Sequence, residues 1–200
     1  MPAAPMPIPE IADAAPARKR FTREEIERLA ETGVFAGQRY ELIDGDLIDK
    51  MGQNPPHSSA IQLLLECLAR FFAIGMIRVQ HPMEAAQGDR ERSLPEPDVA
   101  VLGERNIEHQ RRHPRGDEML LVIEVSDTTA AFDRSRKATL YARAGVPEYW
   151  VLDLNRRMLV VHREPDGTQY RQMFLHGAEE TVSIPGRSES VRVGDILPAA

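Results

Sequence analysis

The segment over residues 119–125 constrains the fold more than any other part of the chain. Its sequence, MLLVIEV, is apolar at every position except Glu124. A strand that does not alternate between apolar and polar residues is buried on both faces, so its sheet must be covered on two sides. We therefore predict a mixed α/β fold, with a central mixed sheet flanked by helices, in a chain whose 200 residues suit one domain.

Capping residues and apolar periodicity place the helices. A T-x-x-E capping box predicts a short helix that starts at Thr22, with its apolar residues on one face. Apolar residues at helical spacing predict a long core helix over 58–73, capped by Ser58 or Ser59. The same spacing predicts a further helix over 133–144.

Alternating runs and turn residues place the strands. Asp44-Gly45 stands between two alternating runs, which is the pattern of a β-hairpin. Strands of the central sheet are expected at 76–80, 97–102 and 119–125. They precede a C-terminal β-meander over 148–154, 158–163 and 168–174, with one or two short strands after it.

Composition sets the expected domain organisation and location. Residues 1–20 are rich in Pro and Ala and are expected to form a disordered tail before a single domain over 21–200. No apolar run approaches the ~18 residues that span a bilayer, and the first residues do not form a secretory signal. We therefore expect a cytoplasmic protein with no membrane partner. Cys67 is the only cysteine, which excludes internal disulfides and multi-cysteine zinc sites.

The charge balance argues against a protein that binds nucleic acid by general electrostatics. The chain has 25 basic and 31 acidic residues, a net charge of −6. Only three of the 25 cations, Lys19, Lys50 and Lys137, are lysines, and the other 22 are arginines. A lysine in a folded segment is then a candidate for a role that needs a compact ammonium.

Two carboxylates interrupt strands that are otherwise apolar. Glu124 lies near the end of residues 119–125, and Asp98 lies near the start of 97–102. If the two strands pair, the carboxylates come together and repel each other unless a cation binds them. Their hard oxygen ligands suit Mg²⁺ or Mn²⁺. The alternative is structural, with Asp98 capping a turn and Glu124 pairing with an arginine.

Lys137 falls on the apolar face of the helix over 133–144. Residues 137, 140, 141 and 144 share this face, where a solvated charge would be out of place. One interpretation is an i,i+4 ion pair with Asp133. The other is an ammonium that reaches the carboxylates and orients a water or stabilises a transition-state oxyanion.

Common nucleotide-binding, zinc-peptidase and serine-hydrolase motifs are absent. Several segments, taken in order, instead resemble the Uma-two family of the PD-(D/E)XK nuclease-like superfamily. They are YELIDGDL at 40–47, His57, PDVAV at 97–101, EVSD at 124–127, Lys137 and YARAGVPEYW at 141–150. The resemblance extends over about residues 21–197.

This resemblance implies a restriction-endonuclease-like core and metal-dependent hydrolysis of phosphodiester bonds. Asp98 matches the motif aspartate and Glu124 the D/E position. Together with the backbone carbonyl of Val125 they are expected to hold Mg²⁺ or Mn²⁺. Ser126 stands where the superfamily pattern has lysine, and Lys137 matches a lysine that has migrated to the next helix.

Four further residues are candidates for the site. Glu41 matches a family glutamate and is either a third acid near the metal or an exposed hairpin carboxylate. His57 either contacts a phosphate or orients Glu41, or it has a structural role such as a cap. Asp127 is expected to cap the loop after its strand rather than support the site, and Tyr141 is expected to pack in the core.

Two functions stay open. The first is a Mg²⁺- or Mn²⁺-dependent endonuclease with DNA as its nucleic-acid partner, as a monomer or homodimer. The second is a nuclease-fold module that has lost cleavage and serves as a binding or structural partner, which the net charge and Ser126 favour. A Lys137 ammonium more than ~8 Å from both carboxylates would argue against the enzyme. In the enzyme, replacing Lys137 with Met is expected to lower activity by about a hundredfold or more, while stability changes little or even rises.

Overall fold

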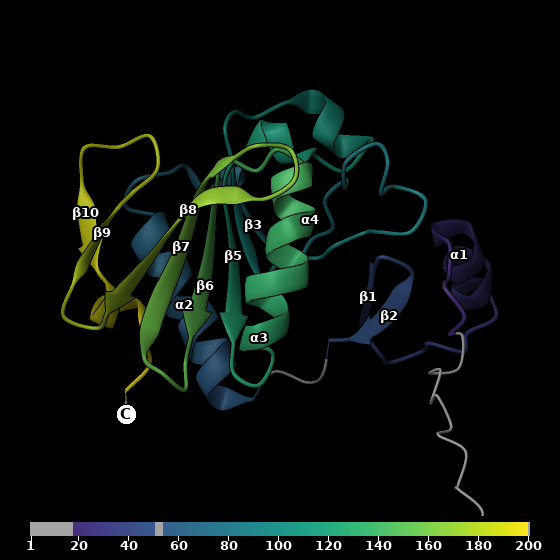
Figure 1. Cartoon of the computed structure of the whole chain (residues 1–200), viewed down its shortest axis with the longest axis horizontal. Coiled ribbons are helices and arrows are strands. Elements are labelled where there is room, and N and C mark those ends of the chain that lie inside the picture. Colours follow the sequence, from purple (N-terminus) through teal and green to yellow (C-terminus); the bar gives the residue numbers. More distant parts are fainter. Residues whose placement is uncertain (1–17, 51–53, 200) are drawn as a thin grey trace, which may run out of the picture.

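The computed structural model describes residues 18–50 and 54–199. A six-stranded sheet in the order β3-β4-β5-β6-β7-β8 forms its centre (Figure 1). Only β5 and β6 pair in parallel, so the predicted mixed sheet is confirmed. The strands are β3 (Ile77–Val79), β4 (Val99–Leu102), β5 (Met119–Ser126), β6 (Glu148–Asp153), β7 (Met158–Pro165) and β8 (Tyr170–Gly177). Most of the tail predicted over 1–20 lies outside the described residues.

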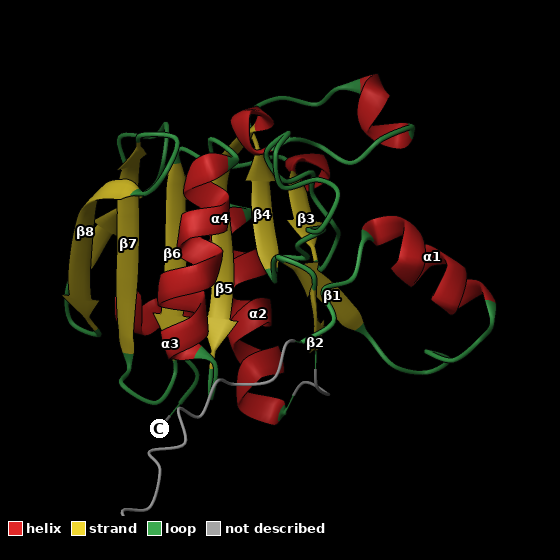
Figure 2. Ribbon diagram, turned by 45° about the vertical axis from the view of Figure 1, so that its right-hand side comes forward, coloured by secondary structure: helices red, strands yellow, loops and turns green. Residues whose placement is uncertain are grey.

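Helices cover both faces of this sheet. Figure 2 shows α3 (Ala130–Phe132) and α4 (Ala138–Arg143) in front of the strands and α2 (Pro55–Leu68) behind them. The prediction that Ser58 or Ser59 caps α2 is wrong, because the helix begins one turn earlier. Asn54 is the N-cap, and its side chain accepts the N–H of His57 at 3.0 Å. The prolines after Asn54 suit the first helical positions, where no intrahelical N–H bond is needed.

The N-terminal region packs at one end of the sheet. The capping box of Thr22 and Glu25 is confirmed at the start of α1 (Arg23–Glu31), although none of the residues of α1 is buried. The predicted hairpin is also confirmed, as β1 (Tyr40–Ile43) and β2 (Asp46–Asp49). Asp44 and Gly45 have φ of 49° and 81°, the left-handed conformations that a tight hairpin turn requires.

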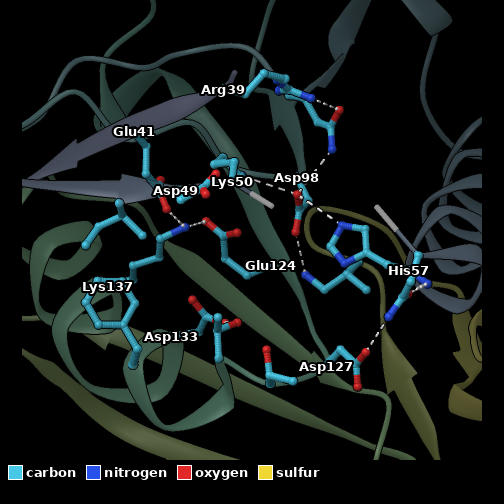
Figure 3. A pocket seen from close by; sticks show the side chains of 17 residues that line it. Arg39, Glu41, Asp49, Lys50, His57, Asp98, Glu124, Asp127, Asp133 and Lys137 are labelled. Atoms are coloured by element: carbon cyan, nitrogen blue, oxygen red, sulfur yellow. Dashed lines mark hydrogen bonds and ion pairs between the residues drawn. The ribbon is translucent and has the colours of Figure 1, made fainter. Parts of the chain in front are cut away.

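The helix predicted over 133–144 begins earlier and contains a π turn. It runs from α3 (Ala130–Phe132) through a π turn (Asp133–Lys137) into α4 (Ala138–Arg143). Gly145, at φ 80°, follows the helix as expected for a C-terminal glycine. Lys137, the last residue of the π turn, points into a cleft (Figure 3). Such π turns occur often at functional sites.

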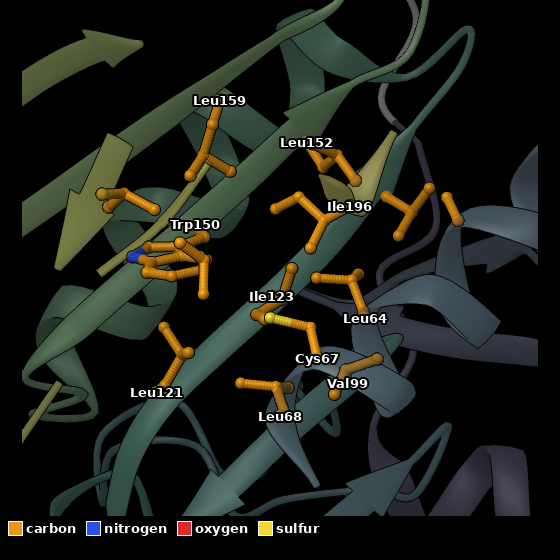
Figure 4. Packing of buried hydrophobic residues seen from close by; sticks show 14 of the residues in the cluster. Leu64, Cys67, Leu68, Val99, Leu121, Ile123, Trp150, Leu152, Leu159 and Ile196 are labelled. Carbon is orange, nitrogen blue, oxygen red and sulfur yellow. The ribbon is translucent and has the colours of Figure 1, made fainter. Parts of the chain in front are cut away.

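The larger hydrophobic core lies between α2 and the sheet (Figure 4). Leu64 and Leu68 of α2 cluster there with Leu121, Ile123 and Trp150 of the sheet. A smaller cluster on the opposite face contains Tyr141 of α4. Strand β5 is therefore buried on both sides, as its sequence predicts. β9 (Thr181–Ser183), β10 (Ser190–Arg192) and a 3₁₀ turn (Val193–Ile196) add to the larger core.

Three further 3₁₀ turns lie at Ile74–Met76, between α2 and β3, and at Ile107–Gln110 and Gly116–Glu118, between β4 and β5. Within residues 18–50 and 54–199, no helix has the length and apolarity required to span a membrane.

Candidate active site

A cleft of about 530 Å³ opens where β5 ends and β4 begins. Because these strands are antiparallel, with Val99 opposite Ile123, Asp98 and Glu124 lie at the same end of the sheet. The hairpin, the start of α2 and the π turn complete the walls, so residues distant in sequence face one another (Figure 3). The cleft contains the predicted site residues Glu41, His57, Asp98, Glu124, Val125, Asp127 and Lys137.

The ammonium of Lys137 lies between two carboxylates. Its Nζ is 2.9 Å from Oε1 of Glu124 and 2.7 Å from Oε1 of Glu41. Tyr141 donates its hydroxyl to the same oxygen of Glu124 at 2.6 Å. Lys137 and Glu124 are 2% exposed and Glu41 is 4% exposed. The 2.9 Å distance from the Lys137 ammonium to Glu124 is well below the ~8 Å beyond which the contact would argue against an enzyme.

These contacts decide three of the alternatives. Glu41 is buried on the ammonium, so its interpretation as an exposed hairpin carboxylate is wrong. Glu124 pairs with a lysine and not with an arginine. The i,i+4 ion pair of Lys137 with Asp133 is also wrong, because the ion pairs of Lys137 are with Glu41 and Glu124. The carboxylate of Asp133 instead accepts hydrogen bonds from Ser126 and Thr129 at 2.5 and 2.6 Å.

Asp98 is held by contacts from four segments of the chain. Its Oδ2 accepts the backbone N–H of Val125 at 2.9 Å. Its Oδ1 faces Nζ of Lys50 at 3.3 Å, and His57 Nε2 and Gln80 Nε2 at 3.4 Å each. His57 therefore contacts Asp98 rather than Glu41, which was one of the alternatives for this residue. The turn-capping alternative for Asp98 is also wrong, because the N–H that it accepts belongs to the neighbouring strand.

The charges perturb one another strongly. Burial would raise the pKa of Asp98, but the hydrogen bond from His57 and the positive charge of Lys50 hold it well below its usual range. Burial raises the pKa of Glu124 above its usual range, and Lys137 opposes this only in part. Burial alone would lower the pKa of Lys137, but Glu124 and Glu41 raise it well above its ordinary value. The two carboxylates therefore favour the charged form of Lys137.

Asp127 and Tyr141 differ in how closely they approach this network. The Oδ2 of Asp127 accepts the side-chain amide of Asn54 at 2.6 Å, which joins the loop after β5 to the N-cap of α2. The contact is with a side-chain amide of the α2 cap, and so it is not the cap of its own loop that the sequence predicts for Asp127. Tyr141 is fully buried, as predicted, and also hydrogen-bonds Glu124, which the sequence does not predict.

Sequence reasoning missed several members of the site. Lys50 and Gln80 contact Asp98, and Asp133 lies buried beside Ser126. The scarcity of lysines was the signal that could have pointed to Lys50. No sequence pattern indicates Gln80, because its contact depends on how β3 pairs with β4.

The donor chemistry fits a hard divalent cation. Among the described residues, six carboxylates line the cleft against the permanent cations Arg39, Lys50 and Lys137, and His57. A phosphodiester entering this cleft would be repelled unless a further cation were present. Carboxylate and carbonyl oxygens are the ligands that Mg²⁺ and Mn²⁺ prefer. No three His, Cys, Asp or Glu side chains in the described ranges are arranged to hold a metal ion together. A site built on Asp98 and Glu124 therefore needs a backbone oxygen or water as well.

The mixed sheet, the helices on both faces and the carboxylates at the ends of β4 and β5 define a nuclease-like α/β fold. The model of the Uma2 family, described as "Putative restriction endonuclease", matches residues 23–192, so the chain belongs to this family. The structure is similar to the crystal structure of "a putative nuclease belonging to DUF820" from Anabaena variabilis. The TM-score is 0.64 at 14% identity, over 88% of this chain and 97% of the other. No curated protein matches the chain at a significant level.

Proposed function

We propose that this protein is a nuclease that uses Mg²⁺ or Mn²⁺ to hydrolyse phosphodiester bonds in DNA. Membership of the Uma2 family and the nuclease-like fold support the reaction class. The observation that carries the proposal is the buried Lys137 ammonium on Glu124, in the same cleft as Asp98. A carboxylate pair with a fixed ammonium beside it supplies both a metal-binding group and a charge for the transition state.

Asp98, Glu124 and the carbonyl of Val125 would hold the metal. Within a strand, the N–H and C=O of one residue lie on the same edge. The Val125 N–H donates to Asp98, so its carbonyl belongs to the edge that faces Asp98. When bound, such a cation activates a water molecule and polarises the scissile phosphate. The hydrogen bonds from Val125 and His57 orient Asp98 for this role.

Lys137 would supply fixed positive charge to the oxygen that becomes negative in the transition state. Glu41 and Glu124 hold its Nζ from two sides, so little reorganisation is needed during the reaction. Tyr141 in turn fixes the carboxylate of Glu124. Lys137 therefore takes the part of the motif lysine, and Glu41 and Tyr141 act as positioning residues.

The alternative is a module that keeps the fold without cleavage. The observation in its favour is that lysines already compensate both carboxylates, Lys50 at Asp98 and Lys137 at Glu124. A protein of net charge −6 also has weak general affinity for a polyanion.

A cleavage assay separates the two functions. Supercoiled, linear and single-stranded DNA and RNA are incubated with Mg²⁺, Mn²⁺ or EDTA. We expect metal-dependent cleavage of DNA by the wild type. Lys137→Arg, which keeps the charge but not the compact ammonium, should be slower by about a hundredfold or more. Lys19→Arg is the surface control and should match the wild type. No cleavage of any substrate by the wild type would favour the module, and full activity of Lys137→Arg would refute the role of Lys137.

A further inference from the structure

Two of the three lysines of the chain enter the same cleft, and each contacts a different carboxylate. The proposed mechanism uses Lys137 and leaves Lys50 without a role. Lys50 directly follows β2, and its side chain is only 13% exposed. A buried ammonium in a chain that otherwise uses arginine requires a physical reason.

Contacts of its backbone and its side chain hold the Lys50 ammonium in place. Its backbone N–H donates to the carbonyl of Arg39 at 2.9 Å, which closes the open end of the hairpin. Its Nζ donates to the carbonyl of Glu96 at 2.5 Å and lies 3.3 Å from Oδ1 of Asp98. The hairpin thus presents one positive charge at the oxygen of Asp98 that faces the cleft (Figure 3).

Asp98 depends on this charge. Its side chain is 3% exposed, and a carboxylate so buried is strongly destabilised unless it is paired. The other donors around it are the N–H of Val125, the amide of Gln80 and the imidazole of His57. Among these contacts, Lys50 alone has a permanent positive charge.

We infer that Lys50 compensates Asp98 in the metal-free protein and competes with the divalent cation for that carboxylate. The inference rests on the proposed function, which assigns the metal to Asp98. Two cations on one carboxylate oxygen repel each other, so a bound cation weakens the contact with Lys50. By linkage, the Lys50 charge weakens cation binding to the same degree. Lys50 therefore keeps the empty cleft folded and sets the metal concentration at which the site loads.

Mn²⁺ binding to four purified proteins tests this inference, with free Mn²⁺ measured by electron paramagnetic resonance. Lys50→Gln removes the charge but keeps a hydrogen-bond donor toward Asp98. It should bind Mn²⁺ more tightly than the wild type by about tenfold or more, because a like charge next to the ligand is gone. Lys50→Arg keeps the charge without the compact ammonium, so its Mn²⁺ affinity should lie nearer to that of the wild type than to that of Lys50→Gln. Lys19→Gln, which removes an exposed lysine, is the matched control and should also equal the wild type.

Thermal unfolding in EDTA gives the second readout. The melting temperature of Lys50→Gln should fall by at least about 2 °C, because Asp98 loses its permanent partner, and saturating Mn²⁺ should restore it. If wild type and Lys50→Gln bind Mn²⁺ equally, or if neither binds it, the inference about Lys50 is refuted. If only Lys50→Gln binds Mn²⁺, the competition is supported and the wild-type site is closed by its own lysine. Tighter binding by Lys50→Gln without DNA cleavage by any variant would overturn the proposed nuclease and leave this inference standing.

Discussion

Replacing Lys137 with Met should strongly destabilise the metal-free protein. From the sequence alone we expected little change, because a partly buried charge would give way to an apolar group. In the structure the ammonium lies between the carboxylates of Glu41 and Glu124, and all three residues are at most 4% exposed. Removing it leaves two facing acids in the protein interior. Breaking a buried ion pair from one side costs about 3–5 kcal/mol.

This free energy corresponds to a large change in melting temperature. For a domain of this size, each kcal/mol lowers the melting temperature by about 2–4 °C, so Lys137→Met should melt on the order of 6–20 °C below the wild type. The loss of stability caused by Lys137→Met should be smaller at pH 5 than at pH 8. Glu124 already has a raised pKa, and without the ammonium it takes up a proton more readily, which relieves the repulsion at the lower pH.

The assay is thermal unfolding in EDTA, supported by urea denaturation at both pH values. The double variant Lys137→Met/Glu124→Gln should recover much of the lost stability, because only one of the two facing carboxylates then remains. Lys19→Met serves as the surface control. If Lys137→Met melts within about 1 °C of the wild type, or if Glu124→Gln brings no recovery in the double variant, the buried charge network does not have the energetics derived from these contacts.

Three further predictions follow from the same structure. Mn²⁺ should raise the melting temperature of the wild type by mass action, and Asp98→Asn and Glu124→Gln should lose this increment; equal shifts in all three proteins would place the metal elsewhere. The pKa of the Glu124 carboxyl is raised in the folded protein, so between pH about 4.3 and this raised pKa the folded protein holds a proton that the unfolded chain has released. Within this range, the contribution of Glu124 to stability falls as the pH rises. Glu124→Gln should therefore gain stability relative to the wild type as the pH rises in EDTA, and urea denaturation showing a constant difference would contradict the shift. A Cβ on Gly116 would lie 2.3 Å from the carbonyl oxygen of Ala144, so Gly116→Ala should cost about 1–3 kcal/mol in urea denaturation, and a neutral result would mean that the loop adjusts freely.

Local patterns predicted the elements that bring the two acids together. The unbroken apolar run of β5 required burial on both faces, and Glu124 was conspicuous because nothing else in that run is polar. The run that contains Asp98 had the same character, and antiparallel pairing of two consecutive strands was enough to place both acids at one end of the sheet. Where a local pattern misled us, at the start of α2, the signal was present in the prolines that follow Asn54.

Contacts between distant segments could not be predicted in this way. Glu41 meets Lys137 only because the β1–β2 hairpin packs over the π turn, and nothing in either segment encodes that docking. The contact between Lys50 and Asp98 depends on the same docking. Alternation within the hairpin shows which residues share a face, but the partner of that face is set by tertiary packing.

The serine at position 126 does not by itself argue for a degenerate site. Ser126 follows Glu124 by two residues in β5 and therefore lies on the same face of the strand. The hydroxyl of Ser126 donates to the carboxylate of Asp133. Lys137 brings an ammonium to the same Glu124 from the following helix, so the charge is present although its origin in the chain differs. Desolvating such charges has a high cost, and a module that needed only its fold would be as stable or more stable with apolar side chains of similar volume at positions 41, 124 and 137. The buried Glu41–Lys137–Glu124 network therefore favours a chemical role for the cleft over a purely structural one.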